Sequence, residues 1–165
     1  MTQSDIKKIV ENLIQTFLDA GKISIDLRKK GLTKEIKSDN TPVSNGDLEV
    51  NKILSKKILS LTPNIPIVSE ETSENKSKNN LENFWLIDPI DGTYDYINDL
   101  DEFTINAGLI IQKKPVAGLI YAPAKNRMFY SYGDDFSFEL INGEPIKLDN
   151  SKNFDKNETK FLSYS

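Results

Sequence analysis

The residues in this sequence best suited to metal binding or catalysis are two aspartates, which lie three residues apart at the end of a short apolar run. Asp88 and Asp91 follow Phe84–Ile87, four apolar residues led by two aromatics. Such a run is too short for a helix and predicts a buried strand that stops in a tight turn. Because Pro89 fixes the backbone, we expect both carboxylates and the Ile90 carbonyl to converge on one small volume. Hard oxygen ligands on a stiff turn suit Mg²⁺.

Further acidic residues are placed where they can meet this turn. Ile65–Val68 predicts a second short strand, and Ser69, Glu70 and Glu71 follow it. Asp47 lies at the start of a predicted helix. Carboxylates gathered in one pocket resist ionisation unless cations neutralise them, so this cluster favours more than one metal ion. A site of this kind attracts an anion such as phosphate.

The same residues also have a structural interpretation. Asp88 and Asp91 can hold a turn through side-chain hydrogen bonds to the backbone. Asp47 can be a first-turn carboxylate that faces the helix dipole, and the residues alone favour that role for it. For the turn, the second strand end with Glu70 favours the metal site.

The composition excludes several kinds of catalysis. The 165 residues include no cysteine and no histidine, which excludes disulfides, thiolate catalysis, phosphohistidine and metal sites with sulfur or imidazole ligands. There is no P-loop motif. A net charge of −4 with mixed signs gives no footprint for nucleic acid. The chain shows no transmembrane segment and no signal-peptide pattern, so we expect a cytoplasmic protein.

The elements that must position these residues are predicted as two helices followed by strands. Helical spacing of apolar residues runs from Asp5 to about Ala20, with Ser4 as the cap, and Gly21 interrupts its continuation. The Lys-rich run through Lys37 is expected to be a solvated helix end or loop. The loop 41–47 leads into a second helix through Ser44 and Asp47, which have the spacing of a capping box. The apolar face of this helix is expected to consist of Leu48, Ile53, Leu54, Ile58 and Leu61, and Thr62–Asn64 ends it.

The remaining segments predict strands. Thr72–Glu82 is a polar loop between the two strands that carry acids, and Phe103–Ile111 pairs with Lys114–Tyr121 around a turn at Gln112–Lys113. Further strands are expected at Met128–Tyr132, Phe136–Ile141 and Pro145–Leu148. We therefore predict an α+β fold of one domain, in which two amino-terminal helices pack on a mainly antiparallel sheet. The Tyr and Phe residues after Ala122 are interpreted as sheet packing.

The run Trp85-Leu86-Ile87-Asp88-Pro89-Ile90-Asp91-Gly92-Thr93, with Ser69-Glu70-Glu71 upstream, resembles the signature of the inositol monophosphatase superfamily of Mg²⁺-dependent, lithium-sensitive phosphatases. Segments 37–44, 102–106 and 118–123 resemble its 3′(2′),5′-bisphosphate nucleotidase branch. The match runs from about Ile6 to Ser165 and covers the family's amino-terminal half. The resemblance implies that residues 1–165 are the amino-terminal metal-binding phosphatase domain of the family's α/β sandwich, and that its carboxy-terminal α/β domain is absent from this chain.

The resemblance also implies a ligand set. Glu70, Asp88 and the Ile90 carbonyl would bind the first metal, while Asp88 bridges to a second ion that Asp91 also holds. The expected cofactor is Mg²⁺, with two or three ions. In the family, an Asp in the missing half completes the second metal site.

Catalytic and substrate-binding roles follow from the same resemblance. Thr93 would orient and help deprotonate the attacking water, Asp47 would accept a hydrogen bond from Thr93, and Glu70 is a further catalytic candidate. Backbone N–H groups around Gly92 and Thr93, together with Asp91, would bind the substrate phosphate. The role of Glu71 stays open between indirect assistance and structure.

Three functions stay open. The first is a phosphatase that converts adenosine 3′,5′-bisphosphate to AMP and phosphate in sulfur assimilation, and Glu102–Asn106 favours it. The second keeps the chemistry but acts on inositol monophosphate or a sugar phosphate. The third is a truncated, non-enzymatic metal-binding or assembly module.

An aspartyl-phosphate mechanism is disfavoured because Pro89 stands where its nucleophile would be. A homodimer and peripheral association with the inner membrane face are left open.

Overall fold

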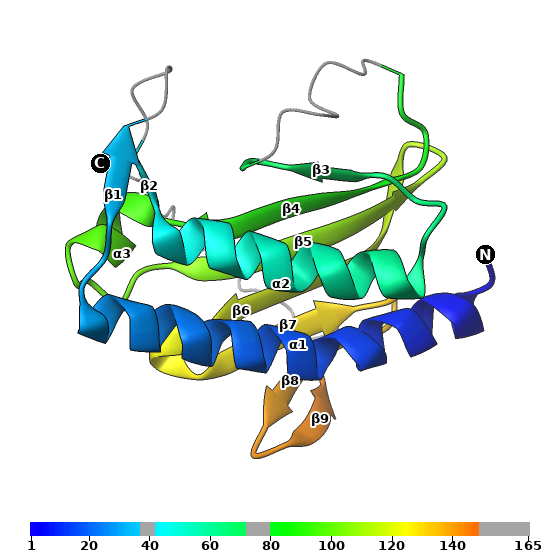
Figure 1. Ribbon diagram of the computed structural model, residues 1–165. Helices are drawn as coiled ribbons and strands as arrows, with labels where there is room; N and C mark the ends of the chain where they lie inside the picture. The colour runs from blue at the N-terminus through cyan, green and yellow to red at the C-terminus, as the bar shows by residue number, and fades with distance from the viewer. Residues whose placement is uncertain (37–41, 72–79, 149–165) are drawn as a thin grey trace, which may run out of the picture.

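Two long helices cover one face of a mixed β-sheet in the computed structural model, which describes residues 1–36, 42–71 and 80–148. Both α1 (Gln3–Lys30) and α2 (Asn45–Leu61) lie across the same side of the sheet (Figure 1). The predicted α+β fold with amino-terminal helices is confirmed. Most of the predicted loop Thr72–Glu82 and the start of segment 37–44 lie outside the described residues.

Helix α1 is longer than its sequence pattern predicts, and it begins earlier. The cap is Thr2, whose hydroxyl accepts from the Asp5 N–H while the Asp5 carboxylate accepts from the Thr2 N–H. Ser4 is therefore not the cap, because the capping box belongs to the residue two positions before it. The helix does not break at Gly21 and ends at Gly31, whose φ of 96° suits glycine.

The glycine in the middle of α1 has a packing reason. A Cβ atom built on Gly21 would overlap the ring of Tyr121 and come within 3.0 Å of Pro123 Cγ. Glycine thus lets the helix approach β6 (Lys114–Ala122) closely, and this approach compensates for its low helix propensity. The pattern of α1 gave no sign of this contact because Tyr121 is distant in sequence.

Helix α2 begins with the capping box that the spacing of Ser44 and Asp47 predicts. Its buried face consists of Gly46, Asp47, Val50, Leu54 and Ile58, and Thr62 caps its end as expected. Leu48 was expected on the apolar face but is 50% exposed. It lies one position after Asp47, which the capping box holds inward, and this fixes the rotation of the first turn.

The described strands form a main sheet of seven strands in the order β3-β4-β5-β6-β7-β8-β9. Only β3 (Ile67–Ser69) and β4 (Phe84–Asp91) pair in parallel, and every other neighbouring pair in the sheet is antiparallel. The remaining strands of this sheet are β5 (Thr104–Ile111), β6, β7 (Arg127–Ser131), β8 (Ser137–Ile141) and β9 (Glu144–Lys147). The mainly antiparallel sheet and its hairpins are as predicted.

Four short elements complete the described structure. Strands β1 (Lys34–Ile36) and β2 (Pro42–Ser44) form an antiparallel ribbon. The expected loop at these positions is wrong in part, because strand pairing there satisfies backbone groups that neither helix can reach. A short helix α3 (Thr93–Ile97) follows the acidic turn, and a 3₁₀ turn η1 (Pro123–Lys125) follows β6.

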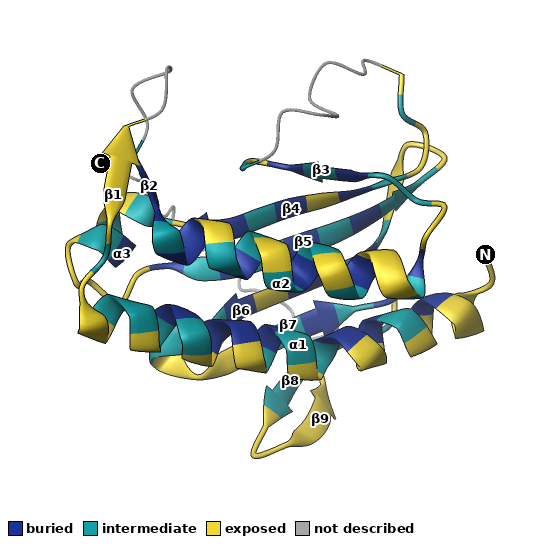
Figure 2. Cartoon of the chain, viewed as in Figure 1, coloured by how far each residue is buried: buried dark blue, intermediate teal, exposed yellow. Residues whose placement is uncertain are grey.

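Strand β4 is buried on one face only. Trp85 and Ile87 are at most 1% exposed and belong to the core under the helices, whereas Leu86 is 51% exposed on the opposite face (Figure 2). The prediction of a buried strand that stops in a tight turn is corrected in two respects. The strand alternates, and it continues to Asp91 through an irregular register between Asp88 and Asp91.

The aromatic residues of the last strands pack within the sheet, as predicted. Tyr130 stacks on Phe138 with ring centroids 5.3 Å apart, and Tyr132 stacks on Phe136 at the same distance. Both tyrosines are buried.

None of the helices in the described part of the chain has the length and apolar content that a membrane crossing requires.

Replacing Gly21 with alanine tests the close approach of α1 to β6. Alanine raises helix propensity by about 1 kcal/mol, but its methyl group overlaps Tyr121, so we expect the free energy of unfolding to fall by about 1–3 kcal/mol. Lys22→Ala, on the exposed side of the same turn, is the control and should change it by less than about 0.5 kcal/mol. Urea denaturation of both variants measures this; a Gly21→Ala chain as stable as the wild type contradicts it.

Candidate active site

The acidic residues come together because β3 and β4 run in the same direction. Ser69 pairs with Ile87, and the Glu70 N–H donates to the Ile87 carbonyl at 3.2 Å. The residues that follow the two paired positions, Glu70 and Asp88, therefore lie side by side at one edge of the sheet. Ser69 also donates to Asn51 Oδ1 at 2.6 Å, which fastens this strand end to α2.

Asp88 carries the clearest electrostatic signature in the site. Burial raises the pKa of Asp88 to about 7, and the charges of Glu70, Asp91 and Asp47 add to the effect. Its Oδ1 atom is buried and has no hydrogen-bond partner in the described chain. A buried carboxylate oxygen without a donor, next to like charges, is what a bound cation would satisfy.

The acidic side chains of the described residues lie near one another but do not form a ready-made metal coordination shell. Within the described ranges, no group of three or more acidic side chains already stands in ligating geometry around one point. After burial, the charges of Glu70, Asp91 and Asp47 raise the pKa of Asp88, so these carboxylates lie close enough to repel one another. The donor set, entirely oxygen, fits Mg²⁺ by its chemistry.

Asp47 has both of the roles that its position allows, each on a different oxygen. Its Oδ2 accepts from the Ser44 N–H at 2.8 Å and from the Ser44 hydroxyl at 2.6 Å, which closes the capping box. Its Oδ1 accepts from the Thr93 hydroxyl at 3.1 Å. Asp47 is 1% exposed, so both contacts are shielded from water. The structural and the catalytic interpretations are thus compatible.

Thr93 is held with its hydroxyl group between two acceptors. Its Oγ1 lies 2.9 Å from the Ile90 carbonyl and 3.1 Å from Asp47 Oδ1. Since the hydroxyl has one hydrogen and neither neighbour can donate, the Thr93 lone pairs remain available to a water molecule.

Gly92 makes the turn that presents Thr93. Its φ is 88°, and a Cβ atom there would lie 2.6 Å from the Glu102 carbonyl oxygen. Both the conformation and the space therefore require glycine.

A support behind α3 was not found from the sequence. The Tyr96 hydroxyl donates to the Ser24 carbonyl at 2.7 Å, and Arg28 donates to the Leu100 carbonyl at 2.6 Å and to Asp101 Oδ1 at 3.0 Å. Burial raises the pKa of Tyr96 far above its ordinary value, so the phenol stays a donor. These contacts tie α3 and the loop after it to the part of α1 that lies beyond Gly21. The end of α1 therefore supports the segment that follows the acidic residues.

Asn106 is a second residue that the sequence prediction missed. It lies on β5 directly opposite Asp88, and its Nδ2 donates to Asp91 Oδ2 at 3.1 Å. The period-two pattern of β5 places it on the same sheet face as the acids, and this was the available signal. The Glu71 N–H donates to Ser69 Oγ at 3.2 Å, and the role of its side chain stays open.

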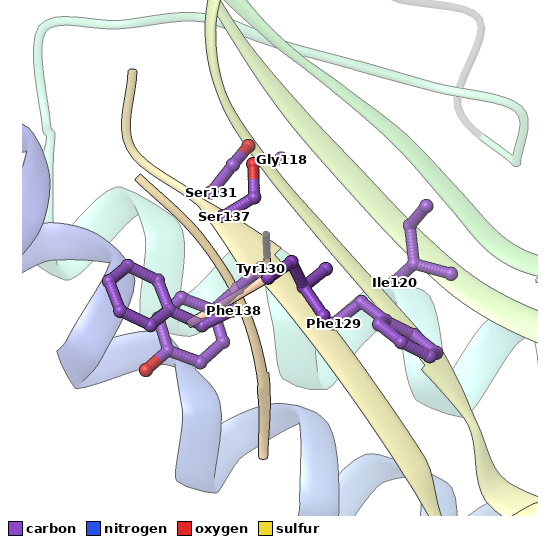
Figure 3. Close-up of a pocket in the computed structure, with 8 residues that line it drawn as sticks. Gly118, Ile120, Phe129, Tyr130, Ser131, Ser137 and Phe138 are labelled. Carbon is purple, nitrogen blue, oxygen red and sulfur yellow. The ribbon is translucent and has the colours of Figure 1, made fainter. Parts of the chain in front are cut away.

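Two hollows in the described surface differ in their relation to the acids. One of about 210 Å³ lies away from them, between Ile120, Phe129 and the serines of β7 and β8 (Figure 3). The other, of about 380 Å³, is bordered by Asp91, Gly92 and Lys125. The second hollow is the relevant one because it opens beside the acidic turn.

Comparison with known proteins shows the family to which the chain belongs. The model of the inositol monophosphatase family matches residues 5–164. The chain belongs to the inositol monophosphatase family. It is 36% identical over 144 residues to a Haemophilus influenzae protein named 3′(2′),5′-bisphosphate nucleotidase CysQ, a match that covers 86% of this chain and 51% of the relative. A Buchnera aphidicola protein of the same name is 34% identical over 132 residues, covering 78% of this chain and 50% of the relative.

Solved structures of the inositol monophosphatase family share the fold. The extragenic suppressor protein suhB from Bartonella henselae superimposes with a TM-score of 0.71 at 23% identity, over 80% of this chain and 52% of that one. An IMPase/NADP phosphatase complexed with Mg²⁺ and phosphate gives 0.69 at 18% identity, over 84% and 52%. The chain thus spans about half the length of the relatives that it matches.

A side chain at Gly92 would destabilise the fold in two ways, through backbone strain and through overlap with a neighbouring atom, and the two can be measured separately. Gly143 has a similar φ, 84°, but no atom within 4 Å of a Cβ atom placed there. We expect Gly143→Ala to cost about 1–2 kcal/mol of unfolding free energy through backbone strain alone. Gly92→Ala should cost about 1–3 kcal/mol more, because its methyl group also overlaps the Glu102 carbonyl. Denaturation of the two variants side by side measures the difference, and equal losses contradict the close approach.

Proposed function

We propose that this chain supplies the amino-terminal half of a Mg²⁺-dependent phosphomonoesterase that hydrolyses the 3′-phosphate of adenosine 3′,5′-bisphosphate. The observation that carries the proposal is Asp88, a half-buried carboxylate whose Oδ1 atom is buried and unpartnered and whose pKa is raised to about 7 beside Glu70 and Asp91. The relatives named bisphosphate nucleotidase support the choice of substrate. The products would be AMP and phosphate.

The proposed ligands are those that the sequence signature predicts. Glu70, Asp88 and the Ile90 carbonyl would hold one Mg²⁺, and Asp88 together with Asp91 would hold another; we propose two or three ions in all. The Thr93 hydroxyl has one hydrogen for two acceptors, so directing it to Asp47 leaves the lone pairs of the Ile90 carbonyl open to a cation. Bound Mg²⁺ would supply charge neutralisation and polarisation of the phosphate oxygens.

The protein's own groups would place the water. Thr93 directs its single hydrogen to Asp47 and accepts a hydrogen bond from the water, which aims the water oxygen at phosphorus. Glu70 is the carboxylate placed to assist removal of the water's proton. The oxygen–phosphorus bond to water forms, the bond to the 3′-oxygen breaks, and the alcohol takes a proton from solvent. No covalent intermediate is required.

The phosphate would be bound at the turn. The N–H groups of Gly92 and Thr93 are the proposed donors, because glycine permits close approach of the backbone, and Asp91 borders the same hollow. The chain spans about half the length of its relatives, and the contacts to the rest of the substrate are not part of this proposal. A role in sulfur assimilation and a cytoplasmic location belong to this proposal.

Asp88→Asn tests the metal site. The substitution keeps the volume and removes one charge, so the fold should be retained. In the complete gene product, we expect Mg²⁺ affinity to fall by more than the roughly 10- to 100-fold that loss of a supporting residue costs at metal sites. Titration calorimetry measures the affinity. Asp26→Asn, an equal change of charge at an exposed position of α1, is the matched control and should bind as the wild type does. Unaltered binding by Asp88→Asn would sink the proposed ligand role.

Phosphate release tests the substrate. We expect the complete gene product with Mg²⁺ to hydrolyse adenosine 3′,5′-bisphosphate with a higher kcat/KM than inositol 1-phosphate or a sugar phosphate. Thr93→Val, which cannot donate to Asp47, should lose about 100-fold or more in rate and controls for contaminating phosphatases. A preference for either competitor moves the assignment to that substrate, and release from none overturns the enzymatic proposal.

A further inference from the structure

The amide of Asn106 has one orientation that the surrounding charges permit. Its Nδ2 atom lies 3.1 Å from Asp91 Oδ2. A carboxylate oxygen only accepts hydrogen bonds, so the nitrogen of the amide must face Asp91, because the opposite orientation would set two acceptors against each other. The Asn106 Oδ1 atom is then directed away from Asp91.

That outward oxygen is buried and unpartnered. Among the buried side-chain nitrogen and oxygen atoms of the described residues, Asn106 Oδ1 and Asp88 Oδ1 are the two without a hydrogen-bond partner. Asp88 and Asn106 are directly paired across β4 and β5, so their side chains project from the same face of neighbouring strands. Two unpartnered acceptors at one cross-strand position indicate that something carrying positive charge or hydrogens belongs between or above them.

A purely structural role does not explain this arrangement. A buried acceptor without a donor loses the hydration that it has in the unfolded chain, whereas an apolar side chain of similar shape at the same place has no such cost. The next residue across the sheet from Asn106 is Ile120, which is 49% exposed, so the neighbourhood accepts apolar side chains. The energy stored at Asn106 is recovered only when its oxygen gains a donor.

We propose that Asn106 is a positioning residue of the metal centre. Its Nδ2 fixes the orientation of the Asp91 carboxylate, and its Oδ1 accepts a hydrogen bond from a water molecule of the occupied site, on the side of Asp88. This inference rests on the proposed function, since it assigns a supporting role at the same centre. It adds a residue of β5 to a site otherwise built from β3, β4 and the start of α2.

The test compares Asn106→Leu with Thr104→Val in the complete gene product. Thr104 lies two residues earlier on the same strand and pairs with Asp91 through the backbone, so its variant controls for altered packing at this edge. We expect Asn106→Leu to lower Mg²⁺ affinity by about 10-fold or more in calorimetry, and Thr104→Val to leave it unchanged. Asn106→Ala, which adds no bulk, should give the same loss and guards against a misfolded leucine variant.

Thermal unfolding without metal separates positioning from a structural role. Leucine removes the unpartnered oxygen, so the metal-free midpoint of Asn106→Leu should equal or exceed that of the wild type, while its rise on adding Mg²⁺ should shrink. A lower metal-free midpoint with unchanged Mg²⁺ affinity would make Asn106 merely structural and overturn the inference. Equal Mg²⁺ binding by wild type, Asn106→Leu and Asn106→Ala overturns it and leaves the proposed function intact. Absence of Mg²⁺ binding by the wild type overturns the proposed function, and the inference with it.

Discussion

The parallel pairing of β3 with β4 is the constraint on which the site depends. In an antiparallel sheet, consecutive strands end at opposite edges, and the acids after Ser69 and Ile87 would lie a strand length apart. One parallel pair in an otherwise antiparallel sheet brings Glu70 to Asp88 at the same edge. Burial raises the pKa of Asp88 to about 7, and the repulsion from Glu70 that this topology creates adds to it.

The helices do more than cover the sheet. The α2 capping box orients Asp47 so that one oxygen serves the helix and the other serves Thr93. On the opposite side, α1 holds Tyr96 and the loop after α3 through the Ser24 carbonyl and Arg28. The turn at Gly92 is thus fixed from both helices, and the groups that stabilise the fold are the same groups that orient the site.

The sequence predicted what depends on local pattern and missed what depends on distant contacts. The capping box at Ser44 and the hairpin at Gln112–Lys113 are encoded within a few residues, and both are confirmed. The length of α1 was missed because Gly21 is explained by Tyr121, a hundred residues away. Local spacing likewise could not show that Leu48 faces solvent.

The site residues divide in the same way. Glu70, Asp88, Asp91 and Thr93 could be named because their types and spacing carry the signal. Asn106 could not, since its significance comes from the register between β4 and β5, which sets it against Asp88.

The unfavourable features of the described chain are concentrated at one edge. The two buried oxygens without donors and the strongly raised carboxyl pKa all belong to the paired positions Asp88 and Asn106. Elsewhere, buried polar groups such as Ser24, Thr62 and Ser69 have partners. A ligand that binds only the folded state returns its binding energy as stability, so a cation at this edge would offset the cost of the acids. On the proposed function, these two unpartnered oxygens are features of a site that holds positive charge and not a fault of packing.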